Sequence, residues 1–121
     1  MYCPWLRQSG EEAPVIPSGA VAGAWATVDR QRGVWKAPAK IALRGIDGPF
    51  LQATDTDQRA HPNLNFIREF AERGTLIWGA WTLDDTDDGR LILIRRLYNM
   101  VERHVQSVLE QAVFEPNTAL T

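Results

Sequence analysis

The chain has little of what several classes of function require. It has one cysteine, Cys3, so no disulfide can form within it, and with only His61 and His104 beside that thiol the sequence holds no cluster of metal ligands. Lysine is also scarce, because Lys36 and Lys40 stand against eleven arginines. The 13 basic and 15 acidic residues give a net charge of −2, whereas nucleic-acid-binding proteins normally carry a basic excess. Nucleic acid is therefore not an expected partner.

Long hydrophobic runs are missing as well. No stretch approaches the roughly 18 apolar residues that a membrane-spanning helix needs, and the first residues lack the basic-then-apolar pattern of a signal peptide. We therefore expect a soluble chain, made in the cytoplasm, with no membrane insertion. Its 121 residues, 45% of them apolar, are enough for one globular domain spanning 1–121.

The inventory of catalytic groups is thin. His61 and His104 have no partner in a recognisable motif, and Cys3 has neither a helix start nor basic neighbours to lower its pKa. The acidic run 84–89 resembles the start of a calcium loop, but the twelfth position, where such a loop has a glutamate, is Arg95. We expect no enzyme activity, no cofactor and no metal, and interpret the run as a solvated connection.

The clearest periodic patterns predict two main helices. The first is expected at residues 18–32, where Ser18 can cap the start, Val21, Trp25 and Val28 share one face, and a glycine follows. Its other side is built of small residues and predicts close approach of another backbone. The second is expected at about residues 94–113, where one apolar face recurs in steps of three and four residues, and Pro116 follows its expected end. That face consists of Ile94, Leu97, Val101, Val105, Val108 and Ala112.

Strand signals are concentrated in two places. Residues 65–70 and 75–82 are rich in β-branched and aromatic side chains, and Gly74 between them favours an antiparallel hairpin. The aromatic segment 2–6 contains Pro4 and suits an edge strand or an arm. The segment 41–45 is left open between strand and turn. Together these elements predict an α+β fold of the broad α/β type, with a mixed sheet containing an antiparallel hairpin and flanked by the two helices.

Three weaker signals complete the pattern. Gly48-Pro49 predicts a turn, residues 91–93 are strand-like, and Thr54, followed three residues later by Asp57, predicts the start of a short helix.

Tryptophan and arginine are the residues present in excess. Five tryptophans are many for this length, and both cores and protein interfaces favour this residue. The arginine surplus suits contacts between proteins, although codon bias in a high-GC genome would explain it equally well. Arg95 and Arg96 stand at an expected helix start, where positive charge is unfavourable, which suggests acidic partners. Those partners are either the run Asp84–Asp88 of the same chain or groups on a neighbouring subunit.

Several separated motifs together resemble the conserved core of the contractile tail sheath proteins of phage tails, R-type pyocins and related injection systems. They occur in the family's order and cover nearly the whole chain. The segments that carry the resemblance are YCPWL (2–6), PSGAVAG (17–23), RGVWKAPAK (32–40), LNFIR (64–68), RG with WGAWTL (73–74 and 78–83), RRLYNMVE (95–102) and FEPN (114–117). The chain departs from the family pattern at Trp81, where the family usually has arginine, and across residues 47–62.

The resemblance implies a structural role without catalysis. Sheath subunits form helical rings around an inner tube, with terminal arms adding strands to a neighbour's sheet, and contraction drives the tube through a target envelope. The implied partners are further copies of the chain, the inner tail tube protein, and baseplate or terminator proteins. The implied location is the virion tail or the injection particle. Candidate interface residues are Tyr2, Trp5, Arg68, Arg73, Trp81, Arg95 and Arg96.

The length of the chain suggests an alternative to the sheath-subunit function. Members of the family continue past the E-P-N motif, so we expect a core domain truncated at its C-terminus, with exposed apolar surface and unpaired strand edges that a partner chain would cover. The alternative function is therefore a sheath-like adaptor or terminator module that binds sheath or tube subunits without polymerising.

Overall fold

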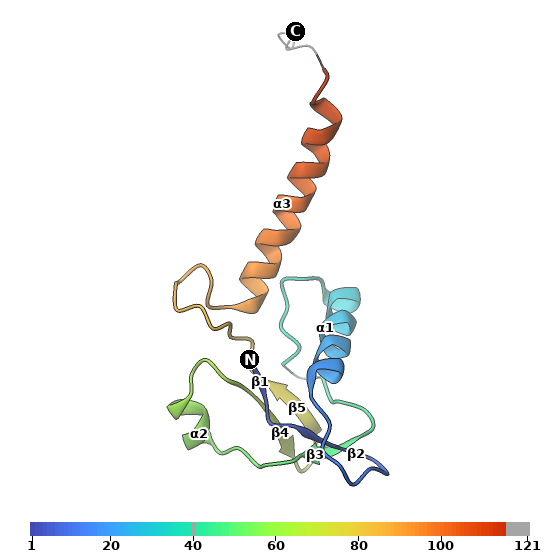
Figure 1. Cartoon of the computed structure of the whole chain (residues 1–121), viewed down its shortest axis with the longest axis vertical. Coiled ribbons are helices and arrows are strands. Elements are labelled where there is room, and N and C mark those ends of the chain that lie inside the picture. Colours follow the sequence, from blue (N-terminus) through green and yellow to red (C-terminus); the bar gives the residue numbers. More distant parts are fainter. Residues whose placement is uncertain (40, 116–121) are drawn as a thin grey trace.

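The computed structural model describes residues 1–39 and 41–115. It contains a small body of strands and short helices from which one long helix projects (Figure 1). The α+β fold class is confirmed, since helices accompany a mixed sheet with an antiparallel hairpin. Within the described ranges no helix has the length and apolar character needed to cross a membrane.

The strands form two small sheets. In the first, β1 (Tyr2–Cys3) runs parallel to β4 (Asn65–Phe70), and β4 pairs antiparallel with β5 (Gly74–Trp78). In the second, β2 (Leu6–Gln8) pairs antiparallel with β3 (Ile46–Pro49). The predicted hairpin is thus confirmed, with Gly74 at a φ of 80° in the turn. The segment 41–45 adds only an isolated bridge between Ala42 and Leu76.

The N-terminal aromatic segment forms two strands rather than one. Its first two residues do form an edge strand, β1, as expected. Pro4, which has no amide hydrogen for a ladder, separates β1 from β2, and Leu6 turns into the core with none of its surface exposed. In this chain the segment therefore pairs internally, with β4 and β3.

The helix α1 (Ser18–Arg32) covers one face of the first sheet. Val21, Trp25 and Val28 are buried as predicted, and Val21 and Trp25 share one core cluster with the cross-strand pair Ile67 and Ile77, which has no exposed surface. The helix has the predicted bounds, but Pro17 occupies the N-cap position and no side chain caps the start, so the expected role of Ser18 is wrong. The small-residue side is also different from expectation, because a Cβ at Gly19 or Gly23 would meet no atom within 4 Å.

Three other boundaries correct the sequence predictions. The predicted turn at Gly48-Pro49 lies in β3, where an irregular register beside Arg7 accommodates the glycine. The predicted strand 75–82 ends at Trp78, because the chain leaves the ladder at Gly79. The strand-like residues 91–93 find only a bridge between Leu91 and Trp81, and from Ile92 they are helical, since three apolar residues cannot distinguish strand from helix.

The short helix α2 (Asp55–Ala60) begins where the sequence predicts. The Thr54 hydroxyl accepts a hydrogen bond from the Asp57 amide, and the Asp57 carboxylate accepts one from the Thr54 amide at 2.8 Å. This reciprocal capping stabilises a helix of only six residues on the second face of the sheet.

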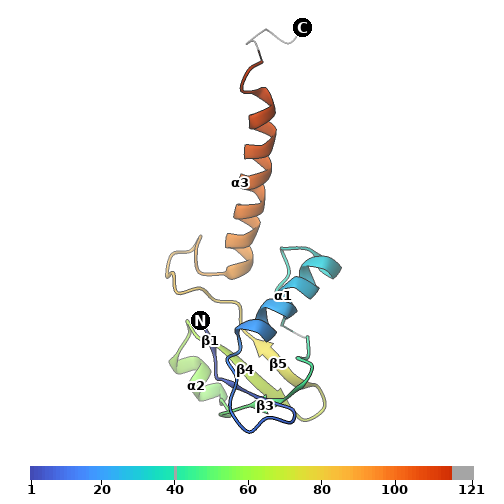
Figure 2. The ribbon, with the colours of Figure 1, turned by 45° about the vertical axis from the view of Figure 1, so that its right-hand side comes forward.

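The helix α3 (Ile92–Ala112) is the second main helix, beginning two residues earlier and ending one residue earlier than predicted. Only its N-terminal end reaches the body, where Ile92 and Leu93 pack against the core and Arg96 bonds Asp29 of α1. The remainder does not flank the sheet, and Figures 1 and 2 both show it extending away from the other elements. The predicted stop at Pro116 lies outside the described residues.

Candidate functional site

The described residues offer several surfaces suited to protein contact. Among the described residues no three His, Cys, Asp or Glu side chains lie close enough to hold a metal ion. His61 and His104 are both exposed, and burial raises the pKa of the Cys3 thiol, which makes the reactive thiolate less available. The features that remain are the base of α3, the face of the sheet beneath α2, and the exposed apolar side chains.

The base of α3 is fixed to α1 by an ion pair. Both terminal nitrogens of the Arg96 guanidinium donate to the Asp29 carboxylate, one of them at 2.7 Å, and the guanidinium lies 4.9 Å from the centre of the Trp25 ring. These hydrogen bonds lower the pKa of Asp29 and raise that of Arg96. Arg96 therefore has an intrachain partner, but that partner is Asp29 rather than the acidic run 84–88. Arg95, one position along, is exposed.

Hydrogen bonds continue from this ion pair into the sheet. The Trp25 indole donates to the Tyr2 hydroxyl at 3.1 Å, and that hydroxyl donates to the carbonyl of Gly79 at 3.3 Å. Burial raises the pKa of Tyr2 above its usual range, which keeps the hydroxyl a donor. Tyr2, a candidate interface residue, thus joins β1, α1 and the segment after β5 within one chain.

A buried asparagine holds the connection that leads to α3. Asn65 has no exposed surface, and its side-chain amide donates to the Trp81 carbonyl and accepts from the Trp81 amide, both at 2.7 Å. The side chain therefore replaces a strand residue as the pairing partner of Trp81. Gly79 is required beside it, since a Cβ there would lie 2.6 Å from the Asn65 side-chain oxygen. Sequence reasoning missed the roles of both Asn65 and Asp29, because the LNFIR segment that contains Asn65 does not indicate its partner and Asp29 belongs to no motif.

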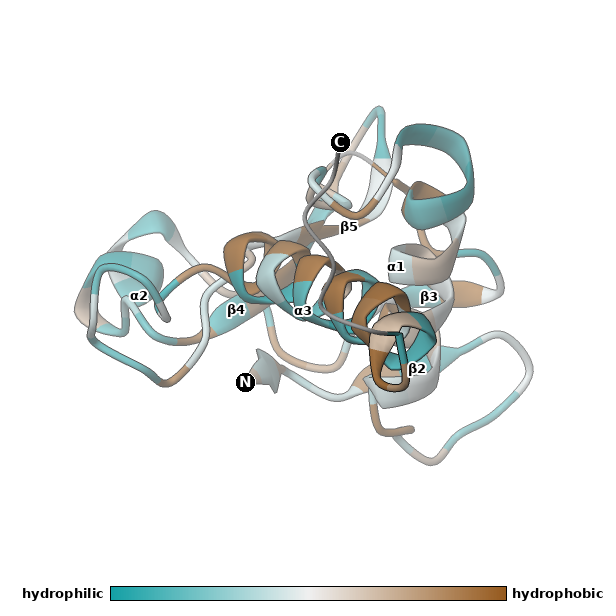
Figure 3. Cartoon of the chain, turned by 90° about the horizontal axis from the view of Figure 1, so that it is seen from above, coloured by the Kyte–Doolittle hydropathy of each residue, from teal (hydrophilic) through white to brown (hydrophobic). Residues whose placement is uncertain are grey.

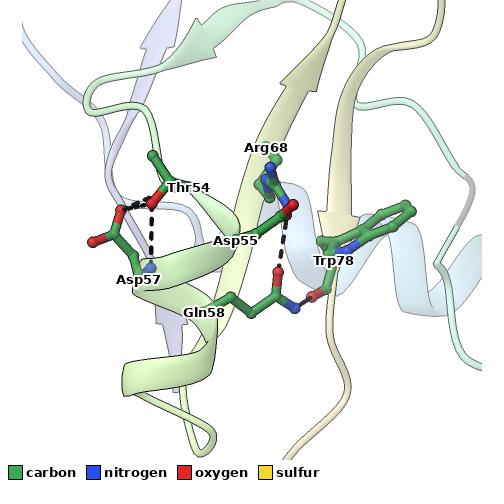
Figure 4. A network of polar contacts seen from close by, with 6 residues as sticks. All are labelled: Thr54, Asp55, Asp57, Gln58, Arg68 and Trp78. Carbon is green, nitrogen blue, oxygen red and sulfur yellow. Dashed lines mark hydrogen bonds and ion pairs between the residues drawn. The ribbon is translucent and has the colours of Figure 1, made fainter.

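Arg68 of β4 binds α2 through an ion pair with Asp55 (Figure 4). Its guanidinium donates to Asp55 at 2.7 Å and lies 5.4 Å from the Phe70 ring, while Gln58 donates to the Trp78 carbonyl at 3.2 Å. Its side chain is only 17% exposed. Arg73, in the turn of the hairpin, is exposed. The predicted interface arginines are thus divided between α2 contacts, the hairpin turn and the base of α3.

Large apolar side chains are exposed at several places. Of the five tryptophans, all within the described ranges, Trp25 alone is buried. Trp5 is 52% exposed and its carbonyl accepts a hydrogen bond from the amide of Phe50, which with Leu51 is also exposed. Trp81 is 37% exposed. Exposed apolar groups that are contiguous mark contact sites with other macromolecules.

A continuous row of such side chains lies on α3. We define the α3 stripe as its eight apolar residues on one face, none of which is buried: Ile94, Leu97, Tyr98, Val101, Val105, Val108, Leu109 and Ala112. Val101, Val105 and Val108 are each about half exposed, and Phe114 beyond the helix is 97% exposed. Figure 3, which views the molecule from above, shows these apolar turns recurring along the helix. The sequence predicts the stripe itself, but not that it lies away from the body.

Comparison with solved structures shows what this fold is similar to. The chain is 43% identical to the sheath of an extracellular contractile injection system, the PVC sheath complex in its contracted state, with a TM-score of 0.89 over 97% of this chain and 34% of that one. Similar values relate it to a chain of the contracted anti-feeding prophage baseplate, at 43% identity, a TM-score of 0.88, and coverage of 98% and 34%. For the contracted anti-feeding prophage helical sheath the identity is 38% and the TM-score 0.83, over 97% of this chain and 34% of that one. No protein-family model and no curated protein matches the sequence.

A small mixed-sheet body with exposed aromatic groups, from which an amphipathic helix projects, is the fold that the chain shares with this class of sheath-complex proteins. More particularly, the chain belongs to the contractile sheath protein family, as its motifs indicated. It spans about one third of the length of the relatives it matches.

Proposed function

We propose that the chain is a structural subunit of a contractile sheath, polymerising as helical rings around an inner tube and contracting to drive the tube through a target envelope. The observation that supports this most strongly is the 43% identity over 97% of the chain to a sheath in its contracted state. Matches that include baseplate and helical sheath assemblies support contacts with further copies and with baseplate proteins. The role is mechanical and needs no catalysis.

The inner tube protein and terminator proteins are the further partners of this proposal. The chain would assemble in the cytoplasm and then reside in the phage tail or injection particle. As a single sheath core domain it would contribute through Trp5, Arg73, Trp81 and Arg95, whose side chains are exposed. Tyr2, Arg68 and Arg96 already have intrachain partners, so their contribution would be to shape the surface around them.

Purified chain, studied by size-exclusion chromatography and negative-stain microscopy, tests the proposal. Tubes or rings with a central channel are the expected particles. A strict monomer at every concentration and salt condition would contradict polymerisation and would favour the adaptor or terminator module instead. Substitution of Arg73 and Arg95 by glutamate provides the sharper measurement, because both side chains are exposed and their loss should reduce assembly without lowering the melting temperature.

A further inference from the structure

The orientation of α3 is inverted relative to an ordinary amphipathic helix. Such a helix turns its apolar face to its own core and its polar face to solvent. Here the α3 residues that line the cleft of about 610 Å³ toward α1 are polar or charged apart from Met100, and include Arg96, Asn99, Arg103 and Ser107. With about 100° between successive residues, the centre of the α3 stripe lies roughly opposite that polar face. The stripe therefore lies on the side away from α1.

The width and length of the stripe fit one partner segment. At about 100° per residue its eight members fall within about 120° of the helix surface, which is the width that another packed element covers. The helix is 21 residues long, and the stripe extends from Ile94 to Ala112 with no charged member. An apolar surface of this kind selects an apolar polypeptide segment rather than an acidic peptide or a nucleic acid.

The matched relatives are long enough to supply such a segment. The matched region covers 97% to 98% of this chain, so the relatives share the region that contains α3, yet it is only about one third of their length. A second copy of this chain is the weaker occupant. Two equivalent stripes would pair about a two-fold axis and close the contact, whereas a helical sheath grows through head-to-tail contacts.

We propose that the α3 stripe is the docking surface for an apolar segment from the other two thirds of a sheath polypeptide. This inference rests on the proposed function and names the surface through which the core region joins the remainder of a sheath subunit. The ion pair between Arg96 and Asp29 and the core contacts of Ile92 and Leu93 hold the start of the helix in position, so the stripe is presented before the segment arrives.

Co-expression tests the docking. The full chain is produced with an affinity-tagged fragment of the PVC sheath comprising the part of that chain outside the matched region, and the soluble captured complex is quantified. We expect the wild-type chain to be captured and Val105→Asp to reduce capture at least tenfold. Ser107→Asp is the matched control, because it adds the same charge on the polar face two residues away. Leu109→Asp is a second stripe variant and should behave like Val105→Asp.

Failure to capture the wild-type chain would overturn the docking proposal, including the case in which the fragment stays insoluble beside it. Equal capture of Val105→Asp and Ser107→Asp would also overturn it. So would a dimer of the lone chain in sedimentation equilibrium that Val105→Asp abolishes. The last result would assign the stripe to a second copy. Both variants entering tubes or rings as well as the wild-type chain would leave the sheath function standing and refute the docking surface alone.

Discussion

The body and α3 contain apolar side chains in similar patterns, but they use them in opposite ways. In α1 the apolar face is buried against Ile67 and Ile77, and the polar face meets solvent. In α3 the polar face lies toward α1 and the apolar face is exposed. Because burial of apolar surface is the main favourable term in folding, the stability of the isolated chain should come almost entirely from the body. Apolar periodicity alone therefore predicts a helix, but not the chain on which its partner lies.

Truncation of a core residue should give the largest effect. Ile67→Ala removes a side chain with no exposed surface from the centre of β4, so the free energy of unfolding should fall by about 2–5 kcal/mol. Val105→Ala, on the half-exposed stripe, should change it by less than about 0.5 kcal/mol. Urea denaturation of the two variants measures the difference. Similar losses would show that the stripe is already buried in the free chain.

Loss of the buried amide should rank second. Asn65→Ala leaves the amide and carbonyl of Trp81 without their partners, at a cost of about 1–3 kcal/mol. Asn63→Ala is the matched control, because its side chain bonds only the exposed Asp85 and its loss should be close to neutral. Hydrogen exchange at the Trp81 amide should accelerate in the first variant alone. Unchanged exchange would mean that Asn65 does not hold this segment.

Removal of Arg96 and removal of Arg95 should affect stability differently, because Arg96 bonds α1 at the base of α3 and Arg95 lies exposed on its surface. Arg96→Ala removes the bonds to Asp29 and the contact with the Trp25 ring, and we expect a loss of about 1–2 kcal/mol. Arg95→Ala should leave the thermal transition nearly unchanged, since this side chain is exposed. Differential scanning calorimetry of both variants measures this. Equal melting temperatures would show that Arg96 does not stabilise the fold of its own chain, and would favour a contact of Arg96 with a neighbouring subunit.

Acid should weaken the same contact by a smaller amount. Arg96 holds the pKa of Asp29 below its unfolded value of about 3.9, so the ionised carboxylate stabilises the fold above that pH. This stability is lost as the pH falls through the lower, folded pKa. Asp29→Asn should therefore show a flatter loss of stability below about pH 4 than the wild-type chain. Parallel curves in thermal melts at pH 2.5–6 would contradict the assignment.

Local patterns in the sequence predict much of the body. Val21, Trp25 and Val28 predict α1 because their spacing places them on one face, and the turn at Gly74 predicts the pairing of β4 with β5. The capping pair of Thr54 and Asp57 likewise predicts a short helix. Each of these predictions depends on residues a few positions apart, which is the range over which spacing is informative.

The remaining features depend on contacts between distant segments. Asp29 and Arg96 are 67 positions apart, and either residue has several other charges nearer in the sequence. The side chain of Asn65 bonds the backbone of Trp81 where a neighbouring strand would otherwise pair with it. No secondary-structure propensity of asparagine indicates that role. Among the candidate interface residues, Tyr2, Arg68 and Arg96 were identified by type, but their partners lie in their own chain. Type and position alone do not distinguish an internal ion pair from one between subunits.

The buried amide of Asn65 has a mechanical consequence. A pull along α3 reaches the body through the segment at Trp81, through the bond from the Ile92 amide to the Ala80 carbonyl, and through the ion pair at Arg96. The first two attachments lie on the connection that follows β5, and the third lies on α1. A load applied to α3 is thus shared between a sheet and a helix, which should resist bending at the start of α3.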